Sequence, residues 1–276
     1  NCIRTLPYLT AWDEKYKDKG LVIIGVHTPE FQFEKKIENV QQSVTKHNIK
    51  YPVVQDNNFA TWSAYANRYW PHKYLIDSEG YIRYDHIGEG GYEETESKIK
   101  ELLGEINSDI DDSTIDVSKI NVDHAEIGTP EIYLGYKLHR GNFGNPEGIT
   151  PNEIVEYIQP SRISPNNVYL DGTWKSNEGN MELVSEDGSI LLIYKAKVLN
   201  IVAGSEQESE LFVSLNNEFL NQSISGDDTK IIDGKSISTI KESKLYNLVD
   251  GPDYELKVLS IDIFGPGFKL YTFTFG

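Results

Sequence analysis

Cysteine is nearly absent from this chain: Cys2 is the only one among 276 residues. A single thiol excludes a disulfide framework within the chain and any zinc site built from several cysteines. Long hydrophobic runs are missing as well, since no stretch approaches the roughly 18 apolar residues of a membrane-spanning helix. The chain therefore depends on ordinary apolar cores, for which 38% hydrophobic and 11% aromatic residues are sufficient.

Positive charge is also scarce, with 26 Lys and Arg against 43 Asp and Glu and a net charge of −17. The deficit is uneven: residues 1–108 hold 13 basic and 16 acidic side chains, whereas residues 109–276 hold 13 and 27. Such a surface repels phosphate backbones, which excludes nucleic acid as a partner. The acidity indicates a well-solvated surface rather than a dedicated cation site.

Helix and strand patterns alternate along the first part of the chain. Residues 2–16 repeat apolar side chains at helical spacing, and residues 21–26 form a continuous apolar run typical of a buried parallel strand. Helical patterns follow over residues 31–47 and 60–69, then an antiparallel hairpin over residues 73–84 and a last helix through Leu103. The segment Gly88-Glu89-Gly90-Gly91 favours a turn and a helix cap rather than a nucleotide loop. This order predicts an α/β domain over residues 1–106.

The pattern changes after residue 106. Residues 107–130 are polar and acidic, which predicts a linker. From residue 131 the apolar period becomes two, in many short runs separated by Asp-Gly and Pro-Gly turns. The sequence therefore predicts a second, all-β domain over residues 131–276, folded as a β-sandwich or jelly roll.

Several motifs resemble one family of exported redox proteins. They are residues 1–9 (NCIRTLPYL), 25–31 (GVHTPEF), 67–77 (NRYWPHKYLID), 129–135 (TPEIYLG) and 271–276 (YTFTFG). In this order they resemble DipZ-type proteins, which combine a thioredoxin-like domain of the TlpA and ResA kind with a carbohydrate-binding-module-like β domain. The resemblance implies a thioredoxin-like fold for residues 1–106, without its opening strand.

The resemblance also implies roles for four residues. Cys2 would be the second, resolving cysteine of a Cys-x-x-Cys pair whose first member precedes Asn1. Glu30 follows a strand end, where it could accept the proton of that thiol. Pro71 is expected to be a cis-proline, and Trp70 to offer its backbone to the substrate chain. The neighbouring His27 is interpreted as a packed loop histidine.

Two aromatic residues of the β domain, Trp174 and Tyr169, are candidates for stacking on a sugar, although core filling is the competing interpretation. The histidines show no metal-ligand spacing, so we expect no metal at the catalytic site and no cofactor beyond a redox-active disulfide. A structural Ca²⁺ in the β domain stays open, and Asp109, Asp111 and Asp112 resemble a calcium loop only faintly.

The sequence thus predicts an extracytoplasmic thiol–disulfide oxidoreductase that acts on protein thiols and disulfides. The resemblance adds a membrane electron-carrier domain or protein as partner, a membrane anchor through a region before Asn1, and a glycan as an open alternative. The competing hypothesis is a redox-inactive surface or scaffold protein whose β-sandwich binds carbohydrate or other protomers. Peroxide reduction is a third, weaker hypothesis.

Overall fold

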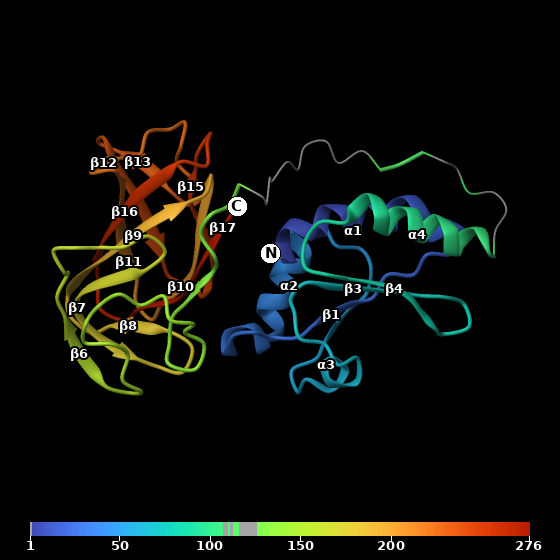
Figure 1. The fold of residues 1–276 in the computed structure, drawn as a ribbon, viewed down its shortest axis with the longest axis horizontal. Coiled ribbons are helices and arrows are strands. Elements are labelled where there is room, and N and C mark those ends of the chain that lie inside the picture. The colour runs from blue at the N-terminus through green and yellow to red at the C-terminus, as the bar shows by residue number, and fades with distance from the viewer. Residues whose placement is uncertain (1, 107–109, 111–112, 116–125) are drawn as a thin grey trace. The chain divides into compact units, whose positions relative to one another are not determined.

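In the computed structural model the chain is described for residues 2–106, 110, 113–115 and 126–276. It divides into two compact units, residues 1–121 and residues 122–276 (Figure 1). The first unit mixes helices and strands and the second contains strands, which confirms the predicted fold class. Most of the predicted linker over residues 107–130 lies outside the described residues, so its bounds stay a prediction.

The first unit is built around two helices that pack on each other. Tyr8, Trp12 and Tyr16 of α1 (Cys2–Tyr16) are buried against Ile99 and Leu103 of α4 (Tyr92–Gly104). These apolar positions recur every three or four residues, as the amphipathic pattern requires. Figure 1 shows the two helices side by side. The packing fixes the direction of α1 and hence the place of Cys2 at its start.

The strands of the first unit form two separate pairs. Strand β1 (Gly25–His27) is parallel to β2 (Val53–Gln55), and β3 (His72–Ile76) is antiparallel to β4 (Ile82–Ile87). The predicted hairpin is therefore confirmed. Within the described part of the chain, no strand joins the two pairs into one sheet.

One strand prediction needs correction. Residues 21–26 were expected to form a strand buried on both faces, but only the last two belong to β1. Leu21 and Ile23 pack on the core, whereas Val22 is 76% and Ile24 59% exposed. Alternating side chains point to opposite faces of an extended chain, and in this structure one of those faces meets solvent.

Two predicted helices are shorter than their apolar patterns. Residues 31–47 split into the 3₁₀ helix η2 (Gln32–Lys35) and α2 (Ile37–Lys46), because Lys36 between them is extended. The helix predicted for residues 60–69 is α3 (Ala60–Ala64), and it ends just before Ala66, whose φ is +49°. A left-handed residue cannot continue a right-handed helix. A further 3₁₀ turn, η1 (Lys17–Lys19), follows α1.

The second unit is a curled sheet that contains 13 strands in its described residues. Its strands are β5 (Ile132–Tyr133), β6 (Ile154–Tyr157), β7 (Val168–Ser176), β8 (Met181–Leu183), β9 (Asp187–Lys195), β10 (Val198–Ser205), β11 (Ser209–Leu215), β12 (Glu218–Phe219), β13 (Lys230–Ile232), β14 (Lys235–Ile240), β15 (Lys244–Asp250), β16 (Leu256–Phe264) and β17 (Phe268–Phe275).

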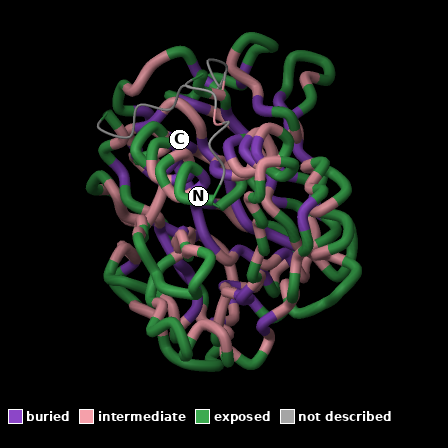
Figure 2. The backbone as a smooth tube through the Cα atoms, turned by 90° about the vertical axis from the view of Figure 1, so that its right-hand side faces the viewer, coloured by how far each residue is buried: buried purple, intermediate pink, exposed green. Residues whose placement is uncertain are grey.

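Strand β7 connects the two halves of this sheet. Its first residues pair with β9 and its last residues pair with β8. Gly172, between these two stretches, has a φ of +97°, and a Cβ there would approach the Asp187 carbonyl oxygen at 3.0 Å. Glycine is suited to such a sharp change of strand direction. Inward side chains of both halves form one large core. Figure 2 marks the buried stretches of the backbone in purple and the exposed ones in green.

Candidate functional site

Cys2 lies in the first turn of α1 and is the free thiol of the described chain. The residue is exposed to solvent on part of its surface, and the protein atoms around the thiol desolvate it. This desolvation is the main reason that the pKa of Cys2 is raised from 9.0 to about 11. The negative charges of Glu30, Glu34 and Glu89 raise the pKa further. The thiol therefore lies in acidic surroundings and stays protonated at neutral pH.

A short loop after strand β1 supplies two of these carboxylates. The Glu34 carboxylate accepts hydrogen bonds from the backbone N–H of Glu30, at 2.6 Å, and of Phe31, at 3.1 Å. The His27 ring nitrogen Nε2 lies 3.0 Å from the Glu34 backbone oxygen. His27 is thus a packed histidine, but it is the last residue of β1 rather than a loop residue as predicted. Desolvation raises the pKa of Glu34, and the two N–H donors and His27 oppose that rise.

The Trp70–Pro71 peptide bond is cis, as expected. The Trp70 indole N–H donates to the Thr28 carbonyl oxygen at 3.0 Å, and its ring lies 4.1 Å from the Trp62 ring, centroid to centroid. Thr28 belongs to the same loop that carries Glu30 and Glu34. The structure thus links the Trp70 segment to the loop whose charges act on Cys2.

A second set of contacts joins α1 to the loop after β4. Arg4, one half-turn beyond Cys2, forms a bidentate ion pair with Glu89, with both N···O distances 2.7 Å. Lys73, two residues after Pro71, donates to the Gly90 carbonyl oxygen at 2.8 Å. Its ammonium also lies 4.7 Å from the centre of the Tyr92 ring. Burial lowers the pKa of Lys73 to about 8, against the opposing effect of Glu89.

The sequence analysis did not identify Glu34, Arg4, Glu89 or Lys73 as parts of this site. Lys73 had a readable signal, since it follows Pro71 by two positions. Glu34 left none, because it contacts backbone N–H groups rather than side chains. Glu89 was interpreted as part of a turn and helix cap, and Gly91 does precede α4 with a φ of +59°. Arg4 and Glu89 are 85 positions apart in the sequence, so no local pattern could reveal their contact.

The two sugar-stacking candidates of the β unit are core residues. Trp174 is fully buried and its indole N–H donates to the Asp171 carbonyl oxygen at 2.8 Å. Tyr169 is 6% exposed, and its hydroxyl accepts a hydrogen bond from the Ser164 N–H at 3.0 Å. A stacking platform needs a free ring face. The prediction that these two rings hold a sugar is therefore wrong for the structure described.

Within the described residues, no three or more His, Cys, Asp or Glu side chains lie together in a group that could hold a metal ion. Asp109, Asp111 and Asp112, the faint calcium-loop candidates, lie outside them. No helix in the described part of the chain is both long and apolar enough to cross a membrane.

The fold and the placement of Cys2 define a thioredoxin-like α/β protein with an appended β unit, and comparisons with known proteins agree. The Redoxin family model matches residues 1–103. The model named "Thioredoxin like C-terminal domain" matches residues 129–276, more than half of the sequence, and the chain belongs to this family.

Three curated relatives are similar to parts of the chain. Protein DipZ of Mycobacterium tuberculosis (strain CDC 1551 / Oshkosh) is 36% identical over 208 residues, which cover 74% of this chain and 29% of DipZ. Thiol-disulfide oxidoreductase YkuV of Bacillus subtilis (strain 168) is 26% identical over 38% of this chain and 70% of its own length. Thiol-disulfide oxidoreductase ResA of Bacillus thuringiensis (strain Al Hakam) is 29% identical over 37% and 56%. The matched part of this chain thus spans less than a third of DipZ.

Proposed function

We propose that this chain is the redox part of a thiol–disulfide oxidoreductase that acts on cysteines of other proteins. The observation that carries the proposal is the position of Cys2. It lies in the first turn of α1, where the negative charges of Glu30 and Glu34 act on the thiol. The loop that carries these two residues is hydrogen-bonded to Trp70 through Thr28. Similarity to YkuV and ResA, both named thiol-disulfide oxidoreductases, supports the same assignment.

In the proposed reaction Cys2 is the resolving thiol of a Cys-x-x-Cys pair. The first cysteine, two positions before Asn1, forms a mixed disulfide with the substrate. Cys2 then loses its proton and attacks the sulfur of the first cysteine, so that the substrate cysteine leaves as a thiol and a disulfide forms on the protein. The high pKa of Cys2 suits this role, because a protonated resolving thiol does not attack until a base removes its proton.

Glu30 is the proposed acceptor of that proton. Its negative charge acts on Cys2, and its backbone N–H is fixed by the Glu34 carboxylate. Trp70 and Pro71 form the proposed contact with the substrate backbone, next to the Thr28–Glu34 loop.

The β unit is proposed to dock the redox unit to a partner. Its support is the concentration of negative charge in residues 109–276, which favours partners with basic surfaces. The resemblance to exported relatives supports an extracytoplasmic location and electron exchange with a membrane carrier. Cell fractionation with an antibody to the β unit tests the location, and recovery with the cytoplasmic fraction would contradict it.

The test of the catalytic proposal is a redox titration of the protein expressed with the residues encoded upstream of Asn1. In glutathione buffers of graded potential we expect a two-electron couple that Cys2→Ser abolishes. The Glu38→Gln variant, which changes an exposed carboxyl on α2, serves as the control and should titrate like the wild type. Absence of a dithiol couple would leave the scaffold hypothesis as the better account.

A further inference from the structure

The loop that carries Trp70 and Pro71 is closed by side chains at its two ends. His72 Nδ1 lies 2.7 Å from Asn67 Oδ1, five positions earlier in the chain. The Asn67 amide also donates to the Tyr69 carbonyl oxygen inside the loop, at 3.2 Å. In the described chain no backbone hydrogen bond runs between two residues of the segment 67–72. The side-chain contacts are therefore what joins the two ends of the loop.

His72 is the centre of this network. Its side chain is 8% exposed, and its Nε2 lies 2.8 Å from Asp85 Oδ2 on β4. The Tyr74 hydroxyl oxygen lies 2.7 Å from His72 Nδ1, and the two rings are 4.0 Å apart, centroid to centroid. The network thus ties the loop to side chains of both strands of the β3–β4 hairpin.

The direction of these hydrogen bonds follows from the chemistry of the partners. A carboxylate only accepts, so His72 Nε2–H donates to Asp85. The Tyr74 hydroxyl lies within reach of both His72 Nδ1, at 2.7 Å, and Asn67 Oδ1, at 3.3 Å. A hydroxyl can donate or accept. Tyr74 therefore completes the network whether or not Nδ1 carries a hydrogen.

Backbone contacts fix the end of the loop at His72. The Pro71 carbonyl oxygen accepts a hydrogen bond from the Gly88 N–H at 2.8 Å, and His72 pairs with Ile87 in the hairpin. Earlier in the loop, by contrast, Tyr69 is 52% exposed. A loop that is ordered before binding spares the entropy that a partner would otherwise lose in ordering it. Closure at His72 thus prearranges the segment next to it.

We propose that His72 is a positioning residue for substrate binding: by closing the loop onto Asn67 and Asp85, it holds Trp70 and Pro71 in place for the backbone of a polypeptide substrate. This inference rests on the proposed function, which assigns the substrate contact to Trp70 and Pro71. Because His72 acts through that contact, it matters most for substrates that have a peptide backbone.

The test compares two disulfides in the protein expressed with the residues encoded upstream of Asn1. Insulin is a polypeptide disulfide, and hydroxyethyl disulfide has no peptide backbone. In each reaction the protein dithiol becomes a disulfide and the substrate disulfide becomes two thiols. Stopped-flow tryptophan fluorescence gives the two second-order rate constants. We expect His72→Ala to lower the ratio of the insulin constant to the hydroxyethyl disulfide constant about tenfold.

General damage to the fold would lower both rate constants and leave their ratio unchanged. An unchanged ratio in a folded His72→Ala protein would therefore overturn the proposal. The control is His47→Ala, at the end of α2, where the ring makes no hydrogen bond within the described residues. This variant should keep the ratio of the wild type.

A second variant tests whether Asn67 and His72 act together. Asn67→Ala removes the other half of the closing contact and should lower the ratio to a similar extent. In the double variant we expect a loss close to that of either single variant, because residues of one network are not additive. Losses that multiply in the double variant would contradict a shared network.

Loop closure itself is measured by amide hydrogen exchange, without any substrate. In His72→Ala the Gly88 N–H, which donates to Pro71, should exchange about tenfold faster than in the wild type. The Thr95 N–H, which donates to the Gly91 carbonyl oxygen at 2.8 Å in α4, should exchange at an unchanged rate and shows that the unit stays folded. Unchanged protection of Gly88 would overturn the closing role of His72.

The two measurements separate this inference from the proposed function. A protein without a dithiol couple that still shows faster Gly88 exchange in His72→Ala would contradict the proposed function and keep the closing role of His72. A protein with the couple but with an unchanged substrate ratio would contradict the inference alone.

Discussion

Arg4 of α1 and Glu89 of the loop after β4 form an ion pair in which Nε donates to Oε2 and Nη2 donates to Oε1, both at 2.7 Å. The Arg4 side chain is 20% exposed and the Glu89 side chain 9%. The geometry is bidentate, which gives such a pair both strength and direction. The pair holds the end of α1 that carries Cys2 against the loop that precedes α4.

The first prediction concerns this pair. Arg4→Met leaves the Glu89 carboxylate largely buried without these two donors, and we expect a loss of about 2 kcal/mol in the free energy of unfolding. Arg4→Met combined with Glu89→Gln should recover part of that loss. Urea denaturation followed by tryptophan fluorescence measures both effects.

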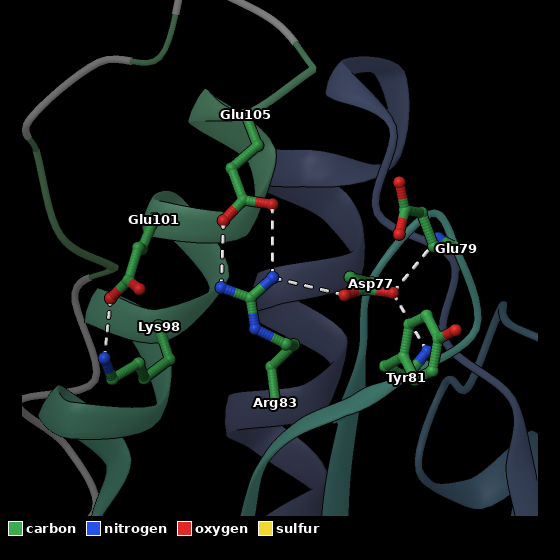
Figure 3. Close-up of polar contacts among 7 residues, drawn as sticks. All are labelled: Asp77, Glu79, Tyr81, Arg83, Lys98, Glu101 and Glu105. Atoms are coloured by element: carbon green, nitrogen blue, oxygen red, sulfur yellow. Dashed lines mark hydrogen bonds and ion pairs between the residues drawn. The ribbon is translucent and has the colours of Figure 1, made fainter.

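A matched control lies on the surface of the same unit. Arg83 bridges Asp77 and Glu105 at 3.1 Å each, but its side chain is 40% exposed (Figure 3). Solvent screens such pairs, so Arg83→Met should lower the free energy of unfolding by clearly less than Arg4→Met does. Equal losses for Arg4→Met and Arg83→Met would contradict the importance given to burial of the Arg4 pair.

The second prediction concerns alkaline pH. Because the pKa of Cys2 is raised in the folded state, the stability that the thiol contributes is fully present below pH 9.0. It is lost as the pH rises toward about 11. The wild type should therefore lose more stability between these two pH values than Cys2→Ser, whose hydroxyl does not titrate there. Parallel pH dependences of the two proteins in urea denaturation would contradict the raised pKa.

The third prediction uses the buried amine of Lys73, whose pKa is lowered from 10.5 to about 8. For a base with a lowered pKa the folded state is penalised below the folded value, and the penalty disappears above the unfolded value. The change in unfolding free energy caused by Lys73→Met should therefore be more stabilising at pH 7 than at pH 10.5, by about 2 kcal/mol. Urea denaturation of the wild type and Lys73→Met at the two pH values measures the difference, and equal effects at both would contradict the lowered pKa of Lys73.

The fourth prediction concerns the β core. Trp174→Ala should cost about 3–5 kcal/mol of unfolding free energy, because it removes a fully buried ring and leaves a cavity. The control is Phe219→Ala on β12, where the ring is 43% exposed and the loss should stay near 1 kcal/mol. A small effect of Trp174→Ala in thermal denaturation would reopen the possibility of a surface role for this ring.

Local patterns predicted those parts of the fold that depend on neighbouring residues. The period of three to four residues located α1 and α4, and the hairpin pattern over residues 73–84 located β3 and β4. Predictions failed where tertiary surroundings decide. The run at residues 21–26 is apolar throughout, yet Val22 and Ile24 meet solvent. Trp174 and Tyr169 have ring types that suit sugars, but Trp174 packs in the core of the β unit and Tyr169 is buried against Gly144.

In the candidate site, too, local motifs were predicted and contacts set by tertiary structure were not. Cys2 and the cis bond at Pro71 were found from short motifs whose spacing lies within a few residues. Glu34 was missed although it lies only four positions from Glu30, because its contact is to backbone N–H groups and leaves no pattern of residue types. Arg4 and Glu89 meet only through the packing of α1 against α4.

The two separate strand pairs of the first unit have a consequence for handling the protein. Strand β1 pairs on one edge with β2 within the described residues, and the side chains of Val22, Ile24 and Val26 beside that strand are exposed. An open strand edge next to exposed apolar side chains is a template for intermolecular β-pairing. Concentrated samples of the chain are therefore expected to self-associate, and light scattering that rises with concentration would report the association.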